Sequence, residues 1–337
     1  MAIRDVIGQE RALRILIGTL IRDRVPSAFL FSGDAGIGKR FAAINYVKAI
    51  NCLHPIDFDC CDSCISCKKI DADMHPDVLN ITLENVEEKL SLEKKENIRS
   101  EYPIDAIRKI EEFLYYSTNE GRKKVVIIDD ADAMNTYSAN AFLKTLEEPT
   151  RESLILLISN KPDIMLDTIR SRCINVKFYP LPVNDSKKII EKFISDKEKD
   201  IEFLIKIAMG RPGLALSKDF IEEREQFIKL FKKMLSIDNK DIWTDKSEIK
   251  TWIDMAIIFL RDLAVCLEFG DCSEKSLIMN VKLQEIKKDK ALNIKTILDA
   301  YMDMQKVREM LDYNLNKAIT WNHIASRMRE LNLTMNL

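Results

Sequence analysis

The chain lacks any long apolar run and any basic leader at its amino terminus. No stretch reaches the roughly 18 apolar residues that a membrane-spanning helix needs. The opening MAIRDVIGQERALR has no apolar segment behind a basic start, so it does not resemble a secretory signal. Low-complexity stretches and internal repeats are not evident either. These absences predict a cytoplasmic protein that makes no contact with a membrane.

An excess of charge of either sign is also missing. Lys and Arg number 52 against 54 Asp and Glu, which leaves a formal net charge of −2. Proteins that bind nucleic acid on their own usually carry a broad basic surface. The sequence therefore excludes a strongly basic nucleic-acid binder, and any contact with DNA is expected to be local or shared with partner chains.

Short apolar runs alternate with helical patterns in the first half of the 337 residues. AFLF (28–31), VVIID (125–129) and LILLIS (154–159) are typical of parallel strands that are buried on both faces. Helical segments such as FAAINYVKAI (41–50) lie between them. The sequence predicts an α/β domain in which helices cover a parallel sheet.

Two boundaries divide the chain. The β-like runs stop at Tyr179-Pro180-Leu181-Pro182, and helical spacing continues from there to the end. A polar stretch around Asp238 divides this helical half again. Residues 297–333 have helical spacing with few breaks, which suits either an ordinary bundle core or packing against partner helices. Three domains are expected, at residues 1–179, 180–237 and 238–337.

Residues 33–40, GDAGIGKR, match a phosphate-binding loop at every position except the last. That position normally carries Ser or Thr, whose hydroxyl ligates Mg²⁺, and here it is Arg40. The loop follows an apolar run and precedes a helical pattern, which is the context the motif requires. A tight glycine-bearing turn is the alternative. The candidate phosphate-binding residues are Gly33, Gly36, Gly38, Lys39 and Arg40.

Polar side chains follow the other two apolar runs. VVIIDDADAM places Asp129 and Asp130 at the end of a strand, where the first acid of such a pair organises Mg²⁺ in P-loop ATPases. Asn160 follows the third run and is a candidate contact for a γ-phosphate. Taken apart from the phosphate-binding loop, Asp129 and Asp130 fit a solvated strand end or a helix cap equally well. Asn160 fits a turn equally well.

Five of the eight cysteines crowd into one stretch. Four of them follow the spacing C-x₈-C-x₂-C-x₂-C, which in a cytosolic chain indicates a structural Zn²⁺ site rather than disulfides. The predicted ligands are Cys52, Cys61, Cys64 and Cys67. Cys60 is a fifth thiol that spacing alone does not exclude, and His54 and His75 are further candidates. Free buried cysteines are the alternative to a metal.

Taken together, these stretches resemble the clamp-loader branch of the AAA+ ATPases. The resemblance covers roughly the first 180 residues and includes the cysteine insert, which looks like that family's zinc module. It is carried by residues 6–39, 52–67, 125–150 and 166–181.

The resemblance implies an AAA+ P-loop domain with a parallel sheet, a helical lid and an all-α carboxyl-terminal collar. It also implies a place in bacterial DNA polymerase III. There, a hetero-pentameric ring with gamma/tau and delta subunits opens the sliding clamp and closes it around primer-template DNA. In this family, Ser171-Arg172-Cys173 is the motif that inserts its arginine into a neighbouring subunit's ATP site. An exposed arginine that pairs with a local acid is the commoner alternative.

Three positions depart from the active members of the family. Arg40 removes the Mg²⁺ hydroxyl, Asp130 stands in place of Glu, and Gly213 stands where the lid arginine is expected. These departures favour a stator that does not hydrolyse nucleotide and binds ATP or ADP weakly or not at all. A hydrolysing gamma/tau subunit should carry Ser or Thr at position 40. A zinc-containing DNA-binding protein with a degenerate ATPase fold is a third reading, opposed by the charge balance and the lack of basic residues interleaved with aromatics near the cysteines.

Overall fold

The structure is a computed structural model, and its residues fall into two compact units, Met1–Asp185 and Ser186–Leu337. The boundaries expected at residues 180 and 238 stay a prediction, since most of residues 194–245 are not described. The structure describes residues 2–92, 101–150, 152–193, 205, 208–216, 226–227, 229–231, 246–269, 286–287, 293–311, 316–331 and 334–335.

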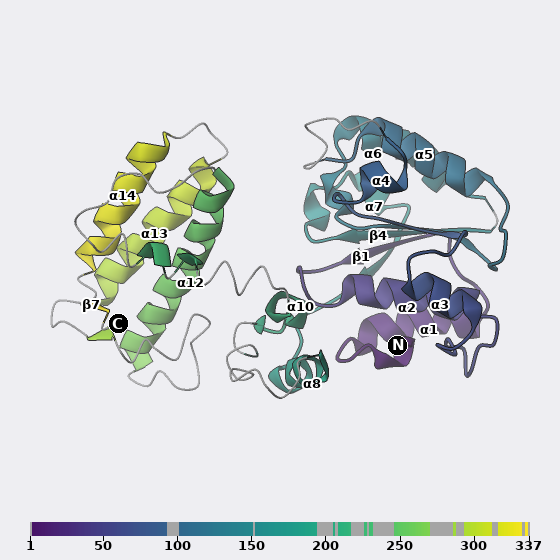
Figure 1. The fold of residues 1–337 in the computed structure, drawn as a ribbon, viewed down its shortest axis with the longest axis horizontal. Helices are drawn as coiled ribbons and strands as arrows, with labels where there is room; N and C mark the ends of the chain where they lie inside the picture. Colours follow the sequence, from purple (N-terminus) through teal and green to yellow (C-terminus); the bar gives the residue numbers. More distant parts are fainter. Residues whose placement is uncertain are drawn as a thin grey trace. The chain divides into compact units, whose positions relative to one another are not determined.

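The first unit is built on a five-stranded sheet with the order β2-β3-β4-β1-β5, in which every neighbouring pair is parallel (Figure 1). The three central strands are buried at every position, as their continuous apolar runs predicted. The α/β fold class is therefore confirmed. The strands are β1 (Ala28–Ser32), β2 (Val78–Ile81), β3 (Lys124–Ile128), β4 (Ser153–Ser159) and β5 (Ile174–Lys177).

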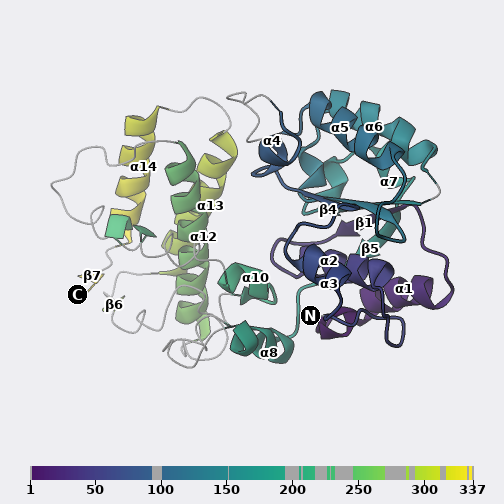
Figure 2. The ribbon, with the colours of Figure 1, turned by 45° about the vertical axis from the view of Figure 1, so that its right-hand side comes forward.

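Helices cover both faces of this sheet (Figure 1, Figure 2). Side chains alternate along β1, so Phe29 packs with the residues of one helical layer and Leu30 with those of the other. One layer contains α1 (Glu10–Ile21), α2 (Lys39–Asn51) and α3 (Ile65–Asp71). The other contains α4 (Val86–Lys89), α5 (Ile104–Tyr115), α6 (Thr136–Glu147) and α7 (Asp167–Arg170). Short 3₁₀ turns lie at Ile3–Asp5, Ala131–Ala133 and Pro162–Ile164.

The strands β2 and β5 have no counterpart among the predicted strands. Both lie at an edge of the sheet and contain only four residues each. In β5 only Val176 is buried, while the other three residues are exposed. An edge strand pairs on one side and needs no continuous apolar run, so its sequence has no strong strand pattern.

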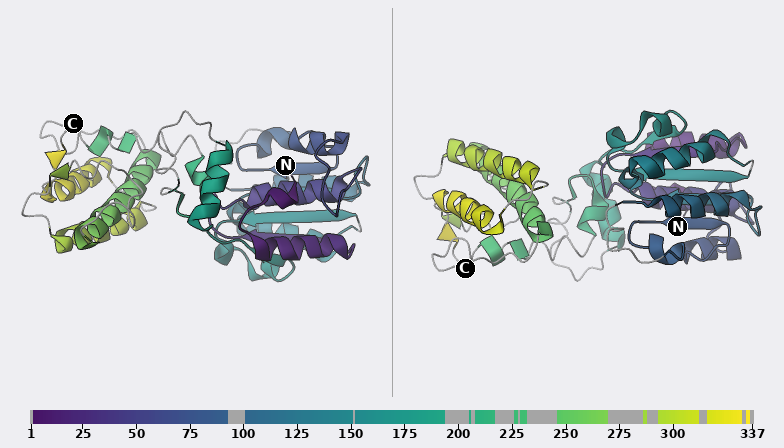
Figure 3. Two further views of the ribbon diagram at one scale, coloured as in Figure 1. Left: turned by 90° about the horizontal axis from the view of Figure 1, so that it is seen from below. Right: turned by 90° about the horizontal axis from the view of Figure 1, so that it is seen from above.

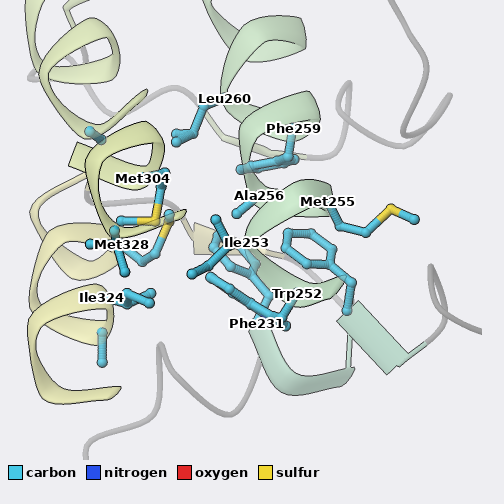
Figure 4. Close-up of a cluster of buried hydrophobic side chains, with 14 of the residues drawn as sticks. Phe231, Trp252, Ile253, Met255, Ala256, Phe259, Leu260, Met304, Ile324 and Met328 are labelled. Atoms are coloured by element: carbon cyan, nitrogen blue, oxygen red, sulfur yellow. The ribbon is translucent and has the colours of Figure 1, made fainter. Parts of the chain in front are cut away.

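The second unit is mainly helical in the residues that the structure describes (Figure 3). Its largest core lies between three long helices and includes Trp252, Phe259, Met304 and Ile324 (Figure 4). The helices of its described residues are α10 (Pro212–Ala215), α12 (Lys246–Phe269), α13 (Ile294–Met310) and α14 (Lys317–Glu330), together with α8 (Val183–Phe193), which begins three residues before the boundary between the units. One short antiparallel pair, β6 (Ile286–Lys287) with β7 (Thr334–Met335), departs from the all-helical expectation. Such a pair joins distant segments and leaves no periodic signal in either.

The membrane expectation can be checked on the described helices. None of them is both long enough and apolar enough to span a bilayer.

A buried carboxylate ties the loop before β3 to the start of β2. Asp77 is fully buried and accepts backbone N–H groups from Asn119 at 2.8 Å and from Glu120 and Gly121 at 2.7 Å. The buried Lys124 ammonium lies 3.4 Å away. Burial opposes ionisation of Asp77, but the three N–H donors and Lys124 outweigh it and hold the pKa of this carboxyl below its usual range.

We expect Asp77→Asn to lower the free energy of unfolding by about 3 kcal/mol. The amide NH₂ group would face backbone N–H donors, and the buried Lys124 ammonium would lose its negatively charged partner. The stabilisation from Asp77 should be complete above about pH 4 and should disappear as the pH falls through its lowered folded-state pKa. Urea unfolding of both proteins across that pH range measures it.

Asp73→Asn is the matched control. Asp73 pairs with Lys89 at 2.7 Å, but both side chains are about one third exposed. An exposed ion pair contributes at most about 1 kcal/mol, so this variant should unfold nearly like the unaltered protein. Equal losses in the two variants would contradict the role given to Asp77.

Candidate functional site

The phosphate-loop motif lies between β1 and α2, in the strand, loop and helix order that it requires. Gly33 has a φ of +142°, and a Cβ atom there would lie 2.4 Å from the carbonyl oxygen of Phe178. Gly38 has a φ of +95° and is the residue before the first turn of α2. Only glycine adopts these positive φ values without strain, and only glycine leaves room for the Phe178 carbonyl beside position 33. The curved path of the loop therefore depends on Gly33 and Gly38. Gly36 also has a positive φ, of +78°.

The Lys39 side chain is buried at the start of α2 and is satisfied by the protein itself. Its ammonium donates to the carbonyl oxygens of Gly33 at 2.6 Å and Asp34 at 2.7 Å, and to Oδ1 of Asn160 at 2.8 Å. Burial lowers the pKa of Lys39, and nearby acids, chiefly Asp129 and Asp130, oppose that shift. The ammonium thus joins the ends of β1 and β4.

The two predicted acids lie beside this lysine. Asp130 adopts a left-handed conformation with a φ of +48°, and its Oδ1 accepts a hydrogen bond from Nδ2 of Asn160 at 2.8 Å. Burial raises the pKa of both Asp129 and Asp130. The structure therefore brings Lys39, Asn160 and Asp130 into one hydrogen-bonded group at the carboxyl edge of the sheet.

Arg40 faces the same group from the first turn of α2. Its Nε lies 3.8 Å from Oδ2 of Asp129, a residue that is mostly buried. The guanidinium partly offsets the effect of burial on the pKa of Asp129. A permanent cation of the chain thus contacts the acid that the motif assigns to Mg²⁺.

Two residues that support this group were not predicted. Oδ1 of Asp132 accepts the backbone N–H of Asn160 at 3.0 Å, which fixes the end of β4. Gln9 donates to the carbonyl oxygen of Tyr179 at 2.8 Å and accepts its N–H at 3.2 Å, while also reaching the carbonyl of Ile37 at 3.4 Å. The acidic run DDAD (129–132) could have indicated that Asp132 belongs to the site, whereas no local pattern around Gln9 indicated its role.

Arg172 lies just after α7, and its guanidinium contacts residues of its own domain. It donates to Oε1 of Glu147 at 2.6 Å and to the carbonyl oxygen of Thr168 at 2.9 Å. About one third of the Arg172 side chain and half of the Glu147 side chain remain exposed. No interaction in the described part of the chain joins Arg172 to the phosphate loop of the same chain.

The neighbours of Arg172 have structural contacts. The Ser171 hydroxyl donates to the carbonyl oxygen of Thr168 at 3.2 Å. Cys173 packs against the core cluster of the sheet, and burial raises the pKa of its thiol to about 12. A thiol with this pKa stays protonated at neutral pH, so Cys173 anchors the motif and is unsuited to be a nucleophile.

The four predicted metal ligands form one cluster. The sulfur atoms of Cys52, Cys61, Cys64 and Cys67 all lie within 4.8 Å of one another. Those of Cys52 and Cys64 are 4.0 Å apart, close to the edge of about 3.8 Å of a tetrahedron with Zn–S bonds of about 2.3 Å. A single ion with four sulfur ligands therefore fits the residues present.

Backbone N–H groups point at three of these sulfurs. Cys61 donates to the sulfur of Cys52 at 3.3 Å, Cys64 donates to Cys61 at 3.4 Å, and Cys67 donates to Cys64 at 3.4 Å. Such bonds favour a thiolate. Hydrogen bonds from the side chain and backbone of Ser63, together with the N–H of Cys64, lower the pKa of Cys61 to about 5. Four sulfur ligands would complete a tetrahedral site and leave no position for a substrate.

The alternative ligands lie outside the cluster. The Cys60 thiol is 3.4 Å from Oδ1 of Asp62, and burial raises its pKa to about 12. His54 is exposed, and Nδ1 of the buried His75 accepts the backbone N–H of Asp77 at 3.1 Å. Gly213, the third departure from the active pattern, lies within α10.

Comparison with known proteins places these features in a family. A family model described as "DNA polymerase III, delta subunit" matches residues 8–182. The delta' subunit of DNA polymerase III from Bacillus subtilis is 27% identical over 335 residues, which is 96% of each chain. The delta' subunit from Pseudomonas aeruginosa is 32% identical over 236 residues, 68% of this chain and 67% of that one.

A tau subunit of DNA polymerase III is also similar. DNA polymerase III subunit tau from Bacillus subtilis is 28% identical over 306 residues, which is 89% of this chain but 49% of the tau chain. The chain therefore belongs to the delta-prime family of DNA polymerase III clamp-loader subunits.

Proposed function

We propose that this chain is a non-hydrolysing subunit of a clamp loader, with a structural role in a ring that loads the sliding clamp on primed DNA in an ATP-dependent way. The observation that carries the proposal is the contact between Arg40 and Asp129. It puts a fixed cation beside the acid that would organise Mg²⁺, and the hydroxyl that would ligate the metal is missing. The ring partners are the gamma/tau and delta subunits, in a hetero-pentamer.

Arg172 is the group that this chain contributes to catalysis. The guanidinium is partly exposed, is held by Glu147 and Thr168, and lies outside its own phosphate loop. A planar, permanently charged group suits bidentate contact with the phosphate oxygens of a nucleotide on an adjacent subunit. In this role the chain has no hydrolysis of its own but stimulates that of its neighbour.

The cysteine cluster holds one structural Zn²⁺ in this proposal. Cys52, Cys61, Cys64 and Cys67 are the ligands, and the metal would cross-link the end of α2, the following loop and α3. Zinc with four thiolates has no open position, so its contribution is to stability and not to chemistry.

We expect one tightly held Zn²⁺ per purified chain. Changing both Cys64 and Cys67 to Ser should abolish zinc binding, because two of the four sulfur ligands are lost. Elemental analysis of protein purified without added metal measures it. Cys60→Ser is the matched control and should keep its zinc, since Cys60 lies outside the cluster. Zinc retained in the double variant would refute the ligand set.

The isolated chain should show no ATP turnover above background. Arg40 supplies no Mg²⁺ ligand, and its guanidinium contacts Asp129. A phosphate-release assay with and without Mg²⁺ tests this, with Lys39→Ala as the control for contaminating ATPases. Steady hydrolysis that disappears in Lys39→Ala would instead favour the alternative of a hydrolysing gamma/tau subunit.

Arg172→Ala should leave the ring assembled but lower its ATPase and clamp-loading rates. An arginine finger contributes about 10³ to 10⁵ in rate at the site that it serves, and only the site facing this chain should be lost. The rates are measured at saturating ATP with clamp and primed DNA. Arg170→Ala is the control, since Arg170 pairs with Asp163 and Asp167 of its own chain. Unchanged rates in Arg172→Ala would exclude the trans role.

A further inference from the structure

Lys48 is a fully buried lysine that lies beside the cysteine cluster and belongs to none of the predicted sites. Its side chain has no exposed surface. The ammonium donates to Oδ1 of Asp62 at 2.5 Å and to the two carboxylate oxygens of Asp71 at 2.9 and 2.8 Å. A buried ammonium is costly unless it is paired, so these contacts must form whenever the domain is folded.

The three residues come from the three segments that carry the thiols. Lys48 is in the last turn of α2, which ends immediately before Cys52. Asp62 lies in the loop between Cys61 and Cys64, and Asp71 is the last residue of α3, one turn beyond Cys67. The ammonium therefore joins every segment that contributes a sulfur to the cluster.

We propose that Lys48 is a positioning residue for the metal site: through Asp62 and Asp71 it holds the thiol-bearing segments in place so that the four sulfurs converge. This inference rests on the zinc assignment made above. Ligands that are already in position lose less conformational freedom when the ion binds, and residues that hold ligands typically change metal affinity by about 10- to 100-fold.

For a variant that neutralises Asp62, the change in charge and the loss of positioning predict opposite changes in zinc affinity. Four thiolates and one Zn²⁺ carry a net charge of −2, so removing a nearby negative charge should by itself favour the metal. Asp62→Asn also weakens the hold of Lys48 on the loop, because the amide oxygen offers a neutral hydrogen bond in place of the ion pair. A loss of zinc affinity in Asp62→Asn would therefore have the sign expected from weakened positioning and the opposite sign to the effect of charge.

The test measures zinc affinity of the full chain by competition with a chromogenic chelator, using Zn²⁺ itself as the probe. Lys48→Met and Asp62→Asn should each bind zinc about 10- to 100-fold more weakly than the unaltered chain. Lys69→Met is the matched control: Lys69 is on α3 between Cys67 and Asp71, but its ion pair with Glu120 at 2.6 Å is partly exposed. It should keep the unaltered affinity. Circular dichroism in excess zinc checks that each variant is folded.

If Lys48→Met does not fold, Asp62→Asn and Asp71→Asn decide the question, since each neutralises one of the two acids and keeps the buried ammonium paired with the other. Unaltered affinity in Asp62→Asn, or in Lys48→Met when folded, would overturn the inference. Zinc uptake by the unaltered chain separates the two proposals. With uptake intact, only the role of Lys48 is refuted; without uptake, the zinc assignment fails and this inference fails with it.

Discussion

Parallel pairing of β1 with β4 and of β4 with β3 is the constraint on which the candidate nucleotide site depends. The carboxyl ends of parallel strands meet at one edge of a sheet, so the residues that follow these strands must gather there. Lys39, Asp130 and Asn160 are far apart in the sequence but form a hydrogen-bonded group at that edge. Helices on both faces are required in turn, because parallel strands need crossovers and bury both of their faces.

Within this frame, one substitution changes the electrostatics of the site. Mg²⁺ comes and goes with nucleotide, whereas the Arg40 guanidinium is part of the chain and cannot lose its charge. Its contact with Asp129 partly offsets the cost of burying that acid, and Lys39 is satisfied by three oxygens of the same domain. The polar groups of this edge are thus paired within the chain, which suits a subunit whose proposed role is structural.

The helix α2 connects the phosphate loop to the cysteine cluster. It starts at Lys39, ends at Asn51 and is followed directly by Cys52. One face packs on the sheet, while the cysteine segment and α3 cover another, so even Asn45, Lys48 and Asn51 are buried. A metal that stiffens this segment would therefore also brace the helix that carries Lys39. The proposed scaffold role and the proposed metal site are consistent in this respect.

The sequence by itself determined the three central strands, the loop context of Lys39, the spacing of the four thiols and the departure at Arg40. Each of these is a local pattern: a continuous apolar run, a glycine motif or a short cysteine repeat. Only the tertiary structure decided the edge strands β2 and β5 and the partners Gln9, Asp132 and Glu147. The physical reason is that these features depend on residues far apart in the chain. Gln9 meets Tyr179 and Glu147 meets Arg172 only because the sheet has folded, and no pattern within either segment encodes its partner.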